Sequence, residues 1–121
     1  MTGTQVMKTA VRLLEAILLV SLLATVVNAQ SPPAKITFSG GPGDTPETAV
    51  VISGALNSIQ GIAAEYDYLR QKFGRQNIAW NLIRQGILQQ GDKVYDRMDL
   101  DLKDGGRKTV FFDISEFFGK L

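Results

Sequence analysis

The chain contains neither cysteine nor histidine among its 121 residues. The missing histidine removes the commonest general base at neutral pH and a frequent metal ligand. The missing cysteine excludes disulfides, thiol catalysis, most zinc or copper sites and the cysteine-linked lipid of a bacterial lipoprotein. A surplus of positive charge is also lacking, because 13 basic residues face 12 acidic ones. These absences argue against a nucleic-acid partner and leave carboxylate, hydroxyl and lysine chemistry for any catalysis.

Residues 1–29 have the pattern of a secretory signal peptide. Two basic residues precede the apolar run Ala16–Val27, and small residues then place a cleavage site between Ala29 and Gln30. The alternative is a membrane anchor, but this run is shorter than the roughly 20 residues that a spanning helix needs. We therefore predict an exported protein, periplasmic or secreted, with no stable membrane span once the leader is removed.

Removal of the leader would leave 92 of the 121 residues, enough for one small domain with a modest core. The leader takes Lys8, Arg12 and Glu15 with it, so 11 basic and 11 acidic residues remain of the 13 and 12 in the whole chain. The exported part is therefore neutral, and its stability must come from packing alone because no disulfide can form.

The segment 91–115 predicts a β-hairpin, because two runs of alternating apolar residues flank the turn Asp104-Gly105-Gly106. A three-residue loop at this turn would place Leu100 opposite Val110. Side chains alternate with period two along a strand, so one side of each run is expected in the core. The residues expected there are Val94, Met98, Leu100 and Leu102 on the first strand, and Val110, Phe112 and Ile114 on the second.

Residues 57–73 predict the main helix, with Asn57 or Ser58 as its N-cap and Gly74 at its C-terminal end. Gly61 weakens this helix and would allow a close approach to a sheet. One stripe at helical spacing is expected to pack on the sheet: Ile59, Ile62, Ala63, Tyr66, Leu69 and Phe73. The charged residues of the remaining surface are expected in solvent: Glu65, Asp67, Arg70 and Lys72.

Residues 77–90 fit two patterns. Ile78, Leu82 and Ile83 have helical spacing, whereas Trp80, the isoleucines and the following turn Gly91-Asp92 favour a strand. We predict a strand, with Gly86 as a bulge or a close-contact point. No single alternation satisfies the whole segment, so its register stays open.

Residues 30–47 are rich in proline, glycine and serine, and predict a linker or loop with at most a short strand at 35–38. Another short strand is expected at 48–52. The order is then a short strand, a helix and a three-stranded antiparallel meander in one domain, residues 48–121. A helix packed on such a sheet is a two-layer α+β fold. Cystatin-like folds have a similar order, which is an analogy of fold and carries no function.

Several segments resemble a group of small, often exported, uncharacterised bacterial proteins. The segments that carry this resemblance are Ser39–Gly41, Glu47–Ile52, Ala64–Tyr66 with Leu69, Tyr95-Asp96, Asp104-Gly105, Phe112–Ser115 and Phe117–Lys120. They span most of the chain beyond the leader, and the last two are the most specific. Pro42 departs from the pattern, at a place where a serine-containing turn is expected. The resemblance implies a common fold and carries no established activity and no functional residues.

Acidic residues of the hairpin are the only candidates for catalysis or metal binding. Asp99, Asp101 and Asp104 fit a calcium loop poorly, because the later ligand positions lack oxygen-bearing side chains. As a glycosidase pair, Asp99 and Asp101 lie side by side on an exposed strand without a sugar cleft. Strand alternation places Asp96 on the same side as the apolar residues. We expect its carboxylate there to accept hydrogen bonds from backbone N–H groups near a turn. The sequence thus predicts no catalytic site, no metal site and no cofactor.

Aromatic residues give the better hint of function. Tyr95 and Phe111 are expected on the hairpin face away from the helix, with Trp80 as a candidate third member. Exposed aromatic residues on a sheet can form a partner surface. The other interpretation is that the segment 35–52 covers them, or that they are scattered singly as isolated apolar surface residues are.

These patterns favour a non-enzymatic interaction or inhibitor-like module whose partner is another envelope or secreted protein. The second hypothesis is a small exported hydrolase that depends on the carboxylates of Asp96, Asp99 and Asp101. A third is a structural component of the envelope. Export, small size and the lack of a catalytic constellation rank the binding module first.

Overall fold

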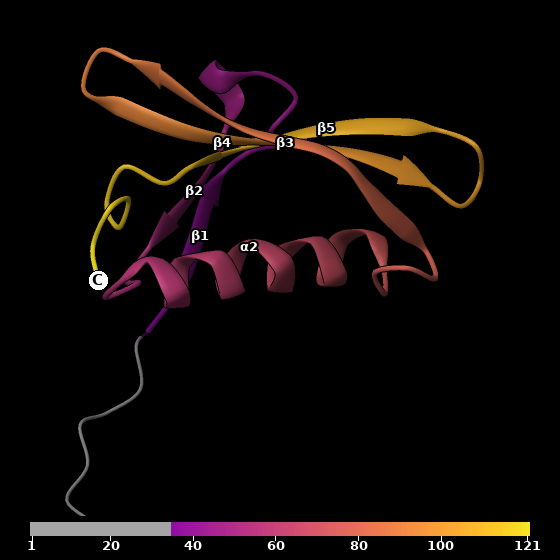
Figure 1. Ribbon diagram of the computed structural model, residues 1–121, viewed down its shortest axis with the longest axis horizontal. Coiled ribbons are helices and arrows are strands. Elements are labelled where there is room, and N and C mark those ends of the chain that lie inside the picture. Colours follow the sequence, from indigo (N-terminus) through magenta and orange to yellow (C-terminus); the bar gives the residue numbers. More distant parts are fainter. Residues whose placement is uncertain (1–34) are drawn as a thin grey trace, which may run out of the picture. The chain divides into compact units, whose positions relative to one another are not determined.

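The computed structural model describes residues 35–121, and these form an α+β fold in which one helix lies along one face of a five-stranded sheet (Figure 1). The predicted leader and its cleavage site at Ala29 and Gln30 lie outside the described residues. The elements are β1 (Thr37–Gly40), the 3₁₀ turn η1 (Pro46–Thr48), β2 (Val50–Ser53), α2 (Ser58–Phe73), β3 (Trp80–Gln90), β4 (Lys93–Leu102) and β5 (Arg107–Asp113). The predicted α+β class is confirmed.

The sheet has the strand order β1-β2-β5-β4-β3. β3, β4 and β5 form the predicted antiparallel meander, and β1 and β2 form a second antiparallel pair. The two parts join where Val50 of β2 lies parallel to Phe112 of β5, so the sheet is mixed and not wholly antiparallel as expected. The short strand that the sequence allowed at 35–38, within the loop-rich segment 30–47, forms as β1 at Thr37–Gly40 and belongs to the sheet. β2 starts at Val50, since η1 occupies the beginning of the strand expected at 48–52.

The β4–β5 hairpin forms with a register two residues away from the predicted one. Met98, and not Leu100, lies opposite Val110. The reason is the turn: the three-residue loop is Lys103–Gly105, closed by a hydrogen bond from Leu102 N to Gly106 O of 2.8 Å. Gly105 takes the left-handed position with φ of 94°. A shift of two residues leaves every side chain on its predicted face, so the expected core residues of both strands still point inward.

The predicted helix is confirmed, with Asn57 as its N-cap, whose side chain accepts a hydrogen bond from Gln60 N at 2.9 Å. Its buried face differs from the expected stripe, because Ile59 and Ile62 are exposed. The residues that α2 buries are Gly61, Ala64, Glu65 and Leu69. Only two of these four residues are small, Gly61 and Ala64, and the larger apolar Ile59 and Ile62 stay in solvent.

Gly61 allows a close approach of the chain's end rather than of the sheet. A Cβ on this residue would lie 2.2 Å from Cε2 of Phe117, which a real side chain cannot do. Phe117 is carried by a turn after β5 and is buried in the core, while its neighbour Phe118 stays exposed.

β3 is a strand, as predicted for residues 77–90, but its bulge lies elsewhere. The register to β4 shifts between Leu82 and Arg84, so Ile83 is the extra residue. Gly86 pairs regularly with Arg97, and a Cβ on it would meet nothing within 4 Å. The expectation of a bulge or close contact at Gly86 was therefore wrong.

The core lies between α2 and the sheet and is closed at one end by the turn that carries Phe117. Its largest fully buried apolar side chains are Trp80, Phe112, Phe117, Ile52, Leu69, Met98 and Leu100. Among residues 35–121, no helix has both the length and the apolar character needed to cross a membrane. The face of the sheet away from α2, here called the outer face, carries no helix in the described part of the chain (Figure 1).

Candidate functional site

Two carboxyl groups meet between the helix and the sheet, in a place where acidic residues are rarely found. Glu65 projects from the buried face of α2, and Asp96 projects from the helix-facing side of β4, with exposed fractions of only 1% and 3%. Gln85 on the neighbouring strand donates a hydrogen bond from Nε2 to Asp96 Oδ2 at 2.6 Å. We call Glu65 and Asp96 the carboxyl pair.

The carboxyl pair holds a proton. The pKa of Glu65 is raised from its ordinary 4.5 to about 10, mainly by burial and then by the hydrogen bond to Asp96 and the charge of that residue. Glu65 is therefore protonated at neutral pH, and we infer that its proton is shared with Asp96, because Glu65 Oε2 and Asp96 Oδ1 are buried with no other hydrogen-bond partner among the described residues. Burial, with the charges of the same two carboxyl groups, also raises the pKa of the adjoining Tyr66.

The prediction for Asp96 was half right. Its burial on the apolar side is confirmed. Its partners, however, are the side chains of Gln85 and Glu65 and not backbone N–H groups. The strand backbone around it is already engaged in the ladders to β3 and β5, so only side chains remain to satisfy the carboxylate.

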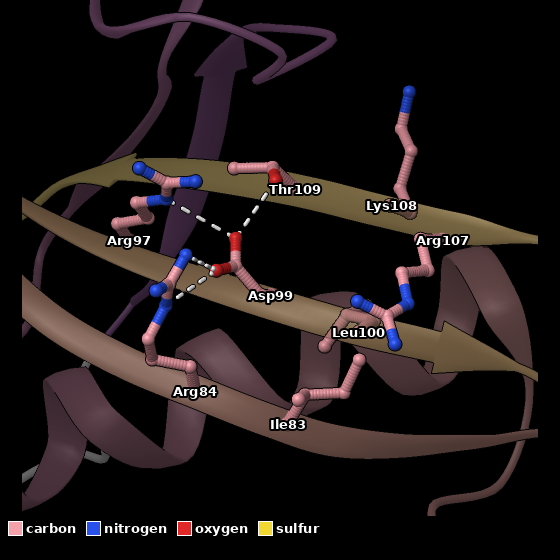
Figure 2. Close-up of a pocket in the computed structure, with 8 residues that line it drawn as sticks. All are labelled: Ile83, Arg84, Arg97, Asp99, Leu100, Arg107, Lys108 and Thr109. Carbon is pink, nitrogen blue, oxygen red and sulfur yellow. Dashed lines mark hydrogen bonds and ion pairs between the residues drawn. The ribbon is translucent and has the colours of Figure 1, made fainter.

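The outer face of the sheet is organised around Asp99 of β4. Its Oδ2 accepts from Nε and Nη2 of Arg84, both at 3.0 Å. Its Oδ1 accepts from Arg97 Nε at 3.1 Å and from the Thr109 hydroxyl at 2.7 Å. Figure 2 shows both guanidinium groups converging on this carboxylate from different sides. Since Arg84 and Thr109 are the cross-strand neighbours of Asp99, the sheet register itself brings these groups together.

Asp99 is poorly suited to acid catalysis. Burial alone would raise its pKa, but the hydrogen bonds from Thr109, Arg97 and Arg84 outweigh that effect and lower the pKa. Asp101 is exposed, and Asp104 accepts a bond from Gly106 N within the turn, at 3.2 Å. In the part of the chain that the structure describes, no group of three or more acidic residues is arranged to hold a metal ion.

A shallow hollow on the outer face surrounds Asp99 (Figure 2). Four basic residues and a single acidic one line it, so its charge is positive although residues 35–121 together carry no net charge. We call it the arginine groove. Its lining residues are Ile83, Arg84, Arg97, Asp99, Leu100, Arg107, Lys108 and Thr109. Lys108 is tied to Asp44 by an ion pair and points away from Asp99 in Figure 2.

The three aromatic residues expected on a partner surface do not share one surface. Trp80 is 1% exposed and faces the helix, where its ring stacks on Tyr66 with centroids 6.4 Å apart. Phe111 does lie on the outer face, but it is buried beneath Arg97, whose Cζ sits 5.7 Å from the ring centroid. Only Tyr95 is partly exposed there. The expectation for Trp80 was wrong because the bulge at Ile83 reverses the alternation along β3.

Sequence reasoning missed Glu65, Arg84 and Arg97 as members of clusters. Glu65 lies four residues after Gly61 and four before Leu69, so it shares their helical face, and this spacing was the available signal. The Arg84–Asp99 pair could not be found, because the bulge decides which residue of β3 lies opposite Asp99.

No protein-family model, curated protein or solved structure matches this chain.

Proposed function

We propose that this chain is an exported, non-enzymatic binding module and that its arginine groove holds an acidic segment of another envelope or secreted protein. The observation that carries the proposal is the arrangement of Arg84 and Arg97 on an outer face that no α-helix of residues 35–121 covers. Export is supported by the leader pattern in residues 1–29.

Arg97 is already held in place for an incoming anion. Asp99 accepts from its Nε, and the ring of Phe111 lies beneath its guanidinium carbon. Its terminal nitrogens have no hydrogen-bond acceptor within residues 35–121, and its side chain is 46% exposed. A guanidinium fixed in this way presents two parallel N–H groups, which match the two oxygens of a carboxylate. Little side-chain entropy is then lost on binding.

Arg107 adds a second site of positive charge to the same groove. Among the described residues, its guanidinium group forms no ion pair with a carboxylate. An acidic segment crossing from β3 to β5 would therefore meet Arg84, Arg97 and Arg107 in turn. Such complementarity favours fast association and fixes the register of the partner, and it weakens with salt.

The proposal predicts that a fluorescent glutamate-rich peptide binds the purified protein at low salt and that Arg97→Lys weakens this binding about tenfold. The variant keeps the charge and loses the bidentate fork, so it tests geometry rather than net charge. Arg107→Ala should weaken binding by a smaller factor. Fluorescence anisotropy at several salt concentrations measures both effects.

Arg70→Ala is the matched control, because Arg70 lies on α2 and pairs only with the exposed Asp67 at 2.9 Å. Its binding curve should overlay that of the unmodified protein. Equal weakening by Arg70→Ala and Arg97→Lys would mean nonspecific charge attraction and would contradict the proposal. Competition by inorganic phosphate at lower concentration than by the peptide would assign the groove to phosphate instead.

The alternative of a carboxylate-dependent hydrolase rests on the carboxyl pair. A protonated carboxyl group beside a second carboxylate is the arrangement that acid–base catalysis requires. Against it stands the burial of Glu65 and Asp96, which leaves little surface for a substrate to reach. If the protein hydrolyses any substrate in a panel, Asp96→Asn should abolish the activity while the circular dichroism spectrum is unchanged. Unaltered activity in that variant would eliminate this mechanism.

A further inference from the structure

The two edges of the sheet differ in how they are protected. β1 forms one edge with only four residues, and it ends at Gly40, where the chain turns toward Pro42. β3 forms the other edge with eleven residues. Edge strands present unpaired N–H and C=O groups, and proteins commonly shorten them or interrupt them with proline or several charges. β3 has no proline and a single charged residue, Arg84.

The regular part of β3 is Arg84–Gln90, which follows the bulge and pairs without interruption with β4. Hydrogen-bonding direction alternates along a strand, so every second residue here points its N–H and C=O away from β4. Within residues 35–121, no backbone hydrogen bond outside the sheet ladder involves residues 81–90. Ile87, at the middle of this segment, is 54% exposed. The unpaired N–H and C=O groups of this segment, with the apolar Ile87 at its middle, can therefore pair with another β-strand.

We propose that two copies of this chain pair through β3, antiparallel and with Ile87 on the two-fold axis. In this register Ile87 lies opposite itself, and the amide side chain of Gln85 lies opposite that of Gln89. Gly86 lies opposite Leu88, and the open space around Gly86 accommodates that side chain. Directly opposite side chains on a pair of strands are close enough to interact.

A second copy fits this edge because the segment is self-complementary. Each apolar or amide residue of the central part, Gln85–Gln89, meets one of its own kind or a glycine under the two-fold operation of a closed symmetric dimer. Arg84 meets Gln90, so no like charges face each other, and Arg84 keeps its own Asp99. The axis is perpendicular to the sheet, so both helices lie on one face of a continuous ten-stranded sheet and both arginine grooves lie on the other. Two joined strands bury little area, so we expect a dissociation constant of roughly 1–100 μM.

The first test is the molar mass of the purified protein in solution, measured by sedimentation velocity at increasing concentration. The unmodified protein should shift from monomer to dimer over the range given above. Ile87→Lys should stay monomeric, because it places two ammonium groups opposite each other. Ile59→Lys on α2 is the matched control, since Ile59 is also exposed and lies away from the edge, and it should dimerise normally. A monomeric unmodified protein at about 1 mM would overturn the proposal.

The register is tested with single cysteines, which the chain otherwise lacks. Ile87→Cys places two sulfurs on the axis, with Cα atoms about 5 Å apart, and should form a disulfide-linked dimer under mild oxidation. Gln89→Cys is the control, because its symmetry mate would lie about 13 Å away along the strand. Cross-linking of Gln89→Cys as fast as Ile87→Cys would contradict the register, and failure of Ile87→Cys to cross-link would contradict the dimer.

Discussion

Phe117→Ala is expected to lower the free energy of unfolding by about 3–5 kcal/mol, the range for removing a buried phenylalanine side chain. The ring fills the space over Gly61 and closes one end of the core. The backbone of the same turn is tied to the start of α2, because Ser58 N donates to Lys120 O at 2.8 Å. Urea denaturation followed by circular dichroism measures the change. Phe118→Ala is the neighbouring control and should cost about 0.5 kcal/mol, since Phe118 is half exposed.

The contact between Gly61 and Phe117 also predicts that Gly61→Ala has opposite effects on the free energy of unfolding in the presence and in the absence of the Phe117 ring. In the unmodified protein, Gly61→Ala should destabilise, because the new Cβ overlaps the ring and overpacking costs about 1–3 kcal/mol. In the Phe117→Ala background the obstacle is gone, so the same substitution should stabilise by about 1 kcal/mol through helix propensity. A double-mutant cycle measures this coupling. Equal effects of Gly61→Ala in both backgrounds would show that the ring does not lie over Gly61.

Glu65→Gln is expected to remove a pH dependence from the stability of the protein. The pKa of Glu65 is raised from 4.5 to about 10 in the folded state, mainly by burial, so the folded protein keeps a proton that the unfolded chain loses. The contribution of Glu65 to the free energy of unfolding is therefore at its maximum below pH 4.5 and is lost as the pH rises toward 10. The slope is at most about 1.4 kcal/mol per pH unit. Glutamine has nearly the same shape, still donates to Asp96 and cannot ionise.

The measurement is a series of urea denaturation curves between pH 5 and 9, within the window set by the two pKa values. As the pH rises, the free energy of unfolding of the unmodified protein should fall relative to that of Glu65→Gln. At pH 7 the variant should be more stable by up to about 3 kcal/mol. Asp67→Asn, on the exposed side of the same helix, should leave the slope unchanged. Parallel curves for Glu65→Gln and the unmodified protein would contradict a buried, protonated Glu65.

Local sequence patterns predicted much of the β4–β5 hairpin and of the helix. The faces of β4 and β5 follow from the two-residue period of a strand. The predicted register was wrong by two residues, which left the predicted face of each side chain correct. Asn57 and Gly74 bound the helix because a side-chain acceptor and a left-handed residue satisfy backbone groups at its ends. These features depend on a few neighbouring residues, so they are readable in the chain.

The candidate sites depend on contacts between distant segments. Asp99 meets Arg84 only because one extra residue at Ile83 shifts the ladder between β3 and β4. Glu65 meets Asp96 because α2 packs on the sheet with the face of Ala64, Glu65 and Leu69, a face that apolar spacing does not select. Neither the bulge nor the helix rotation is marked by a local pattern.

The sequence by itself determined the α+β class, the positions of the main helix and the hairpin, and the placement of Asp96 among apolar side chains. These follow from periodicity and capping, which are properties of short stretches of chain. The tertiary structure decided the mixed sheet, the partner of Asp96, the arginines around Asp99 and the open edge at β3. Those features are set by how β2 and β5 meet and by which face of α2 packs best, and such choices minimise the free energy of the whole core rather than of any one segment.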